Sequence, residues 1–247
     1  MRSLTDHTDE RAHVKAAEIL AQLETMGNEG TARVLRNHGA HAPCLGVKIG
    51  DMKVLQKQLK SDYSLSVELY DSGVYDAMYL AGLIADPERM TKKDLTRWIK
   101  TASTPIASYV VGPIAAGSPA GWAQALAWIK SKKEIENIAG WAAISATASL
   151  YPDDELDLDE YQRLLTEVER TIHAAKDAVR YEMNAFVISV GSYIGSLTET
   201  AIETGQRVGV LKVDTGKTAC EVPFAPDYIQ KVKARGSIGK KRKSAMC

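Results

Sequence analysis

Apolar side chains recur every three or four residues along most of this chain. In residues 9–26, for example, Ala16, Ile19, Leu20 and Leu23 fall on one side of a helical wheel. The same period continues through ten or more segments of roughly 8–18 residues, which are separated by breaks rich in Gly, Pro or Ser. Strand patterns do not alternate with the helical ones, as a parallel sheet would require. The pattern therefore predicts an all-α fold.

The predicted helices follow one another in pairs at intervals of roughly 35–40 residues, which is the scale of HEAT-type repeats. Such pairs stack on their neighbours and form a curved superhelix with a concave face. We therefore expect a HEAT-like α-solenoid over residues 1–205. A compact helical bundle is the alternative.

The pattern changes after Gly205, so residues 206–247 are interpreted as a C-terminal extension of the same domain. Residues 207–213 and 218–222 are β-prone and flank a turn signal, which predicts either a small hairpin or an extended loop. A short helix is expected over residues 226–233. Residues 236–243 have the composition of a mobile tail.

An uncharged stretch of 29 residues, 101–129, raises the question of a membrane span. Its Gly and Pro residues divide it into two segments that are too short to cross a bilayer, so two buried helices are predicted. The N-terminus lacks the apolar run of a signal peptide. The three cysteines are far apart and odd in number, which favours a reducing compartment, and we expect a cytoplasmic protein.

The charge is unevenly distributed, although 31 basic and 31 acidic side chains cancel overall. Residues 151–203 carry 4 basic and 12 acidic side chains, whereas residues 204–247 carry 10 basic and 3 acidic ones. An uncompensated basic cluster attracts phosphates through counterion release. The end of the chain therefore indicates contact with a polyanion, and its last basic residues are Lys240, Lys241, Arg242 and Lys243.

Other candidate sites are weaker. His38, His41 and Cys44 have metal-like spacing but lack an evident fourth ligand, so no metal is expected. The acidic run of residues 153–160 does not fit a calcium loop and is interpreted as a solvated helix cap. No nucleotide-binding loop or serine-hydrolase elbow is present, so we expect no cofactor.

Several short motifs resemble the AlkD-type DNA alkylation repair superfamily over residues 10–200. They are TARVLRNH at 31–38, LGV at 45–47, KVL at 53–55, VELYD at 67–71, WAAI at 141–144 and NAFVI at 184–188. The resemblance implies HEAT-like repeats curved around a DNA duplex. Its glycosylase members release cationic alkylated purines, using an Asp, a supporting Arg and aromatic residues that contact the DNA backbone.

The sequence departs from that catalytic set. Where the family has Trp-Trp-Asp-x-x-Asp, residues 101–112 contain no carboxylate, and Ser108 or Tyr109 is nearest to the catalytic Asp. Trp141 stands where the family has Arg, while Phe186 keeps the later aromatic. Loss of such a charged group costs ~10²–10³ in rate. The sequence therefore predicts a divergent member without efficient glycosylase activity.

Three functions remain open at this point. The first is a noncatalytic protein that binds duplex, damaged or branched DNA. The second is a glycosylase that uses another carboxylate, with Asp51, Asp76 and Glu182 as candidates, and the third is a protein-binding scaffold. The residues expected to contact DNA are Arg33, Arg36, Lys48, Lys53, Lys100, Arg180 and the terminal cluster Lys240–Lys243. For Arg180, an ion pair with Asp177 or Glu182 is the alternative. For Trp141, Tyr109 and Phe186, the alternative is that the aromatic side chains only fill the cavity in which the family has its catalytic residues.

Overall fold

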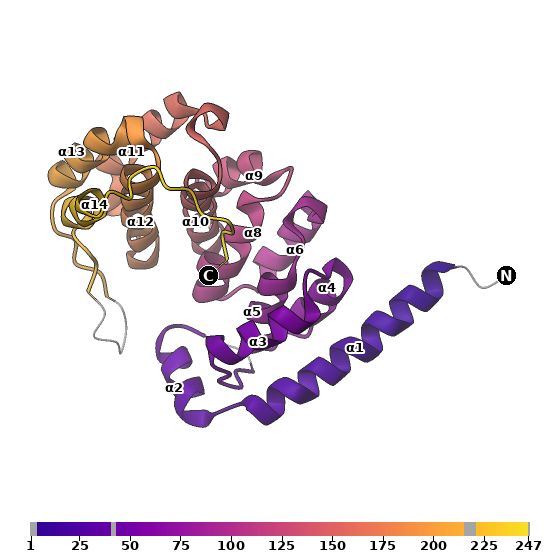
Figure 1. Cartoon of the computed structure of the whole chain (residues 1–247). Helices are drawn as coiled ribbons and strands as arrows, with labels where there is room; N and C mark the ends of the chain where they lie inside the picture. The colour runs from indigo at the N-terminus through magenta and orange to yellow at the C-terminus, as the bar shows by residue number, and fades with distance from the viewer. Residues whose placement is uncertain (1–3, 41–42, 215–220, 247) are drawn as a thin grey trace.

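Most helices of the chain lie in two curved rows, one outside the other (Figure 1). The computed structural model describes residues 4–40, 43–214 and 221–246. The outer row contains α4 (Tyr63–Asp71), α6 (Lys92–Thr101), α9 (Gly121–Trp128), α11 (Leu158–Thr171) and α13 (Thr198–Val208). The inner row contains α5 (Tyr75–Ile84), α8 (Gly112–Ala116), α10 (Glu134–Leu150), α12 (Asp177–Tyr193) and α14 (Ala225–Ala234). This arrangement confirms the predicted all-α solenoid of helix pairs.

The remaining helices close one end of the rows or connect them. The N-terminal end contains α1 (Leu4–Met26), α2 (Glu29–Asn37) and α3 (Ile49–Leu59), and α1 packs against α4 and α5. Short connecting turns are η1 (Pro87–Arg89), α7 (Thr104–Ile106), η2 (Ala107–Val111), η3 (Asp153–Glu155), η4 (Ile172–Ala174) and η5 (Gly195–Leu197). The chain thus forms a curved stack of helix pairs.

The repeat interval is less regular than predicted. Only 29 residues separate the starts of α4 and α6 at Tyr63 and Lys92, and 29 again separate α6 from α9 at Gly121. The outer helices of these repeats are short, with 9, 10 and 8 residues, whereas α11 has 14. The later pairs reach the expected interval because their helices are longer.

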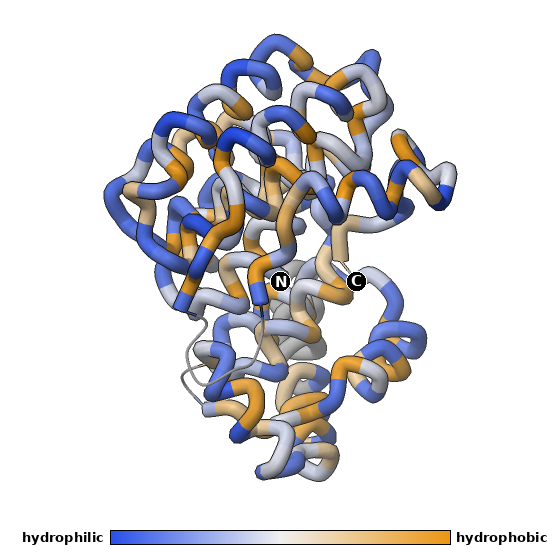
Figure 2. The backbone as a smooth tube through the Cα atoms, turned by 90° about the vertical axis from the view of Figure 1, so that its left-hand side faces the viewer, coloured by the Kyte–Doolittle hydropathy of each residue, from blue (hydrophilic) through white to orange (hydrophobic). Residues whose placement is uncertain are grey.

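The two rows differ in how much of each helix is buried. In α11, only Tyr161, Leu164, Leu165 and Val168 are buried, which is the single stripe of an amphipathic surface helix. In α10, every residue from Ile138 to Ile144 is buried, so this helix is enclosed by its neighbours. Figure 2 shows the resulting alternation of hydrophilic and hydrophobic segments along the helices.

The uncharged stretch contributes to this core. Its elements α7, η2 and α8 bury most of their residues, including Ile106, Val110 and Ile114, and α9 buries Trp128. No single helix in the described ranges is long and apolar enough to cross a membrane, and the one helix pair that passes such a test together, α12 with η5–α13, is bent by 115°.

The C-terminal extension contains the expected short helix, α14, but its last residues differ from the expectation. Residues 209–214 and 221–224 contain neither helix nor strand, while the middle of the expected hairpin, residues 215–220, lies outside the described residues, as does His41. The expectation of a mobile tail is wrong. The Gly239 N–H donates to the Ser192 carbonyl at 2.9 Å, and the Arg242 N–H donates to the Ser149 carbonyl at 2.8 Å. Residues 236–246, called the tail below, therefore lie across α12 and α10 (Figure 1).

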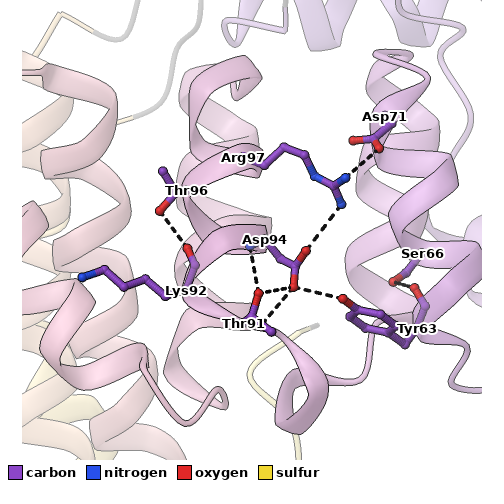
Figure 3. Close-up of polar contacts among 8 residues, drawn as sticks. All are labelled: Tyr63, Ser66, Asp71, Thr91, Lys92, Asp94, Thr96 and Arg97. Carbon is purple, nitrogen blue, oxygen red and sulfur yellow. Dashed lines mark hydrogen bonds and ion pairs between the residues drawn. The ribbon is translucent and has the colours of Figure 1, made fainter.

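A polar clamp joins the outer helices α4 and α6 (Figure 3). The Thr91 hydroxyl and the Asp94 carboxylate form a capping box at the start of α6. The same carboxylate accepts a hydrogen bond from the Tyr63 hydroxyl at 3.0 Å, and Arg97 bridges it to Asp71. Burial of Asp94 favours its neutral form, but the hydrogen bonds from Thr91 and Tyr63 and the charge of Arg97 outweigh burial and lower the pKa of Asp94. The clamp thus favours the carboxylate.

Replacing Asp94 with alanine is expected to lower the free energy of unfolding by about 1–3 kcal/mol, because the helix cap and the link to Tyr63 are lost together. Urea denaturation at pH 7 measures the change. Thr96→Ala is the control, since the Thr96 hydroxyl bonds only within its own exposed turn and its loss should stay within ~0.5 kcal/mol. Equal effects for the two variants would contradict a clamp between helices.

Candidate nucleic-acid interface

The inner row contains an irregular turn, η2, in the segment where the family resemblance expects a catalytic Asp. Pro113 lacks the N–H that an α-helix would direct at the Tyr109 carbonyl, and the Gly112 N–H instead bonds to Ala107, five residues back. Gly112 also allows close contact with α10, because a Cβ there would lie 2.6 Å from the Ala142 Cβ. The turn therefore sets Ser108 and Tyr109 beside the inner helices.

A buried carboxyl group faces this turn. The Ser108 hydroxyl donates a hydrogen bond to Oε1 of Glu182 at 2.6 Å, and both residues are less than a tenth exposed. Removal of the Glu182 carboxyl from water raises its pKa to about 7, although the hydrogen bond from Ser108 acts in the opposite direction. Near neutral pH, this acid is therefore protonated in a large fraction of molecules.

Ser108, Tyr109 and Glu182 line one groove on the inner row. The groove has a volume of about 610 Å³ and runs between α10 and α12 toward α14 and the tail. Among the described residues, Glu182 is the only carboxyl group that lines it, and its cations are Lys240, Lys241 and Arg242. This groove is the candidate interface.

The tail brings its cations to the groove through specific contacts. The Lys241 ammonium donates to the Ala148 carbonyl at 2.9 Å and pairs with Asp153 at 2.8 Å, so it anchors the tail to the C-terminal end of α10. Lys240 and Lys243 are exposed, and Arg242 is half-buried. Lys241 thus holds the segment in place, while its neighbours present charge at the surface.

The other predicted DNA-contacting cations are distributed over the rest of the chain. Arg33 and Arg36 are on α2, Lys48 immediately precedes α3, Lys53 is on α3, and Lys100 is in the last turn of α6; all five are exposed. Arg36 also forms an ion pair with Glu29. None of these five residues lines the groove, so the structure does not gather all the predicted cations into one cluster.

Arg180 is held by an ion pair and by hydrogen bonds to backbone carbonyls. Its guanidinium pairs with Asp177 at 3.1 Å, which is one of the two alternatives considered for it. It also donates hydrogen bonds to the carbonyls of Ile172, His173, Ala175 and Lys212. These bonds tie the start of α12 to the loop after α13.

Trp141 and Phe186 lie behind the groove, in the core. They are 3% and 0% exposed, and their ring centroids are 5.1 Å apart. Phe186 also stacks on Tyr161, whose ring contacts Trp122. Four residues align with the catalytic site of the family. Ser108 and Tyr109 line the groove, whereas Trp141 and Phe186 fill the interior.

Of the three carboxylates considered as replacements for the catalytic Asp, only Glu182 lines the groove. Asp51 is exposed in the first turn of α3. Asp76 is fully buried and accepts hydrogen bonds from the Leu45 and Val47 N–H groups at 2.6 and 2.7 Å. Asp76 therefore has a structural role.

Sequence reasoning missed Tyr79, Tyr193 and Tyr228 as groove residues. Their positions carry no motif, because the fold brings them together from α5, α12 and α14. The small side chains at helical spacing in α10 and α12 were the available signal.

Comparison with known proteins places this fold in context. Residues 19–225 match the family model described as DNA alkylation repair enzyme. The chain belongs to the DNA alkylation repair enzyme family. Two Listeria proteins, uncharacterized protein Lin0241 of L. innocua and uncharacterized protein Lmo0209 of L. monocytogenes, are 31% and 30% identical to it over 224 residues. Each alignment covers 88% of this chain and 97% of the relative.

A solved structure supports the HEAT-like assignment. It is described as a new family of proteins related to the HEAT-like repeat DNA glycosylases with affinity for branched DNA structures. It superposes with a TM-score of 0.86 at 34% sequence identity, covering 94% of this chain and 99% of the other. This DNA alkylation repair family member therefore has a HEAT-like repeat fold.

Proposed function

We propose that this family member binds branched or distorted DNA and lacks efficient alkylpurine glycosylase activity. The observation that carries the proposal is the basic tail, which lies across the inner row beside the groove. The solved structure with affinity for branched DNA supports the choice of ligand. We expect the protein in the cytoplasm, associated with the nucleoid, and without a nucleotide cofactor.

The electrostatics of the groove support binding without glycosylase chemistry. Departure of an alkylated purine leaves positive charge on the sugar, which a nearby carboxylate stabilises. Glu182 is the only groove carboxyl group in the described chain, and its pKa of about 7 leaves much of it neutral at neutral pH. Its Oε1 is already occupied by the hydrogen bond from the Ser108 hydroxyl.

The tail supplies the positive charge of the groove. Helices α8 and α10 of the inner row contain no Lys or Arg, so phosphates near the middle of the inner row would meet cations from the tail. Each phosphate contact contributes roughly −0.9 to the slope of log affinity against log salt on duplex DNA.

The triple variant Lys240→Ala, Arg242→Ala and Lys243→Ala is expected to weaken binding to a four-way DNA junction about 10- to 100-fold at ~50 mM salt. The salt slope should become shallower by up to roughly 3. Lys241 is retained because it anchors the tail. Fluorescence anisotropy across a salt series measures both quantities.

A matched control removes the same charge from the outer helices, with Lys92→Ala, Lys93→Ala and Arg170→Ala. This variant should bind nearly as well as the unmodified protein. If the two triple variants lost affinity for the junction equally, the loss would depend on net charge alone, which would contradict a role for the tail. Release of methylated purines from alkylated DNA above the protein-free background would contradict the noncatalytic part of the proposal.

A further inference from the structure

The groove has the shape of a slot between two helices. On α12, Glu182, Ala185, Ser189 and Ser192 line it along one face that spans about 15 Å of helix, and Ile188 and Tyr193 line it beside them. The facing residues of α10 are equally small: Ala142, Ser145, Ala146 and Ser149. Small side chains on both sides leave a hollow where two inner helices would otherwise close over each other.

The slot contains polar groups whose bonding is incomplete. The Ser192 hydroxyl is buried and has no hydrogen-bond partner within the described residues. Glu182, at the other end of the same stripe, has a hydrogen bond only on Oε1 among the described contacts. Buried polar groups are normally paired, so the unpaired Ser192 hydroxyl indicates that a polar ligand belongs in the slot.

Aromatic rings surround the same slot. Its four tyrosines come from four elements and are Tyr79, Tyr109, Tyr193 and Tyr228. Tyr109 is 54% exposed and Tyr228 is 47% exposed. Exposed rings in such a position are typical of platforms on which nucleobases stack.

The two ends of the slot differ in charge. The charged groups that share the cavity with Glu182 are Lys240, Lys241 and Arg242 of the tail, and its other ionisable groups are the four tyrosines. The cations are able to pair with a phosphate, whereas the Glu182 carboxyl group is able to form hydrogen bonds with the polar edge of a nucleobase. A nucleotide carries both features in one unit, and an apolar peptide carries neither.

We propose that the slot receives one unstacked nucleobase of a branched DNA, with Tyr109 as its stacking surface, Glu182 as its hydrogen-bonding partner and the tail cations on the adjacent phosphates. This inference rests on the proposed DNA-binding function and specifies which structural feature of the DNA is recognised. Near neutral pH, the Glu182 carboxyl is divided between its two protonation states, so it is able to donate to a base nitrogen or to accept from an amino group.

The test uses the full chain and three-way DNA junctions that carry 2-aminopurine, either unpaired at the branch point or paired within an arm. Stacking on a protein ring changes the environment of the unpaired probe only. The unmodified protein should alter the fluorescence of the branch-point probe and leave that of the arm probe unchanged.

Tyr109→Ala should abolish the fluorescence change and weaken junction binding about 5- to 100-fold, in line with the loss of one base–aromatic stack. Its affinity for an intact duplex should be unchanged. Tyr109→Phe keeps the ring and should retain both the signal and the affinity. Circular dichroism and thermal melting verify that each variant is folded.

The possible results separate the two proposals. If the unmodified protein binds junctions but Tyr109→Ala retains both the affinity and the signal, the nucleobase slot is excluded while DNA binding stands. A loss as large for Tyr109→Phe as for Tyr109→Ala would overturn the stacking role in favour of the hydroxyl group. If the unmodified protein binds neither junction nor duplex at ~50 mM salt, the proposed function fails, and the slot fails with it.

Discussion

Replacing Glu182 with glutamine is expected to stabilise the protein at pH 8 and to have little effect at pH 5. The folded-state pKa of Glu182 is about 7, whereas the ordinary value is 4.5. A raised pKa means that the folded state holds the proton more tightly than the unfolded state. Its contribution to stability is therefore complete below pH 4.5 and is lost as pH rises through 7.

The size of this effect follows from the separation of the two pKa values. A difference of about 2.5 pH units corresponds to roughly 3 kcal/mol of destabilisation above pH 7 in the unmodified protein. Glutamine has nearly the same shape, cannot ionise and still offers an oxygen to the Ser108 hydroxyl. Urea denaturation at pH 5 and pH 8 should therefore show a gain for Glu182→Gln at the higher pH only.

Asp51→Asn provides the control, because Asp51 is an exposed carboxylate at the start of α3. It should not show the same gain at pH 8. Equal changes for Glu182→Gln at both pH values would show that the carboxyl group is not held in its neutral form by burial.

Replacing Gly46 with alanine is expected to cause a large loss of stability. Gly46 has φ of +79°, a conformation that costs other residues roughly 1–2 kcal/mol. A Cβ there would lie 2.2 Å from the Asn28 carbonyl oxygen and 2.4 Å from the Ala32 nitrogen. Both are backbone atoms at the N-terminal end of α2, so a side-chain rotation cannot relieve the contact.

The neighbours of Gly46 prevent the segment from moving away. The N–H groups of Leu45 and Val47 donate to the buried Asp76 carboxylate, and the Leu45 carbonyl accepts from the Asn28 N–H at 2.9 Å. Strain and overpacking together should lower the free energy of unfolding by about 3–5 kcal/mol. Urea denaturation of the purified variant measures the loss.

Gly50→Ala is the matched control, since a Cβ at Gly50 would meet no atom within 4 Å and the residue is helical. Alanine there should be neutral or stabilising by up to ~1 kcal/mol. Similar losses at both positions would show that the tight backbone approach around Gly46 has no special cost.

Features of the fold that depend on nearby residues were predictable from the sequence. The capping box of Thr91 and Asp94 is an example, because its partners are three residues apart and the chemistry is local. The stripe on α11 and the burial of the uncharged stretch follow from helical period and composition in the same way. The 29-residue repeats were missed because their outer helices are only 8–10 residues long.

The candidate site depends on distant residues, and much of it was not predictable. The pairing of Ser108 with Glu182 spans 74 positions, and neither residue has a local signal for the other. The tail was expected to be mobile because its Gly, Ser and Lys composition is that of a flexible segment. Its order comes from the carbonyls of Ser149 and Ser192, which only the assembled inner row places under it.

The path of the tail has a consequence for how the protein unfolds. In a simple solenoid, each repeat contacts only its neighbours, so the two ends unravel independently. Here the tail continues from α14 over α12 and α10, and Met246 lies close enough to Gly82 on α5 that a Cβ there would be 2.9 Å from its Cε. The last repeat is thereby connected to an early one. We expect this link to make unfolding more cooperative than the one-dimensional stack of helices would allow.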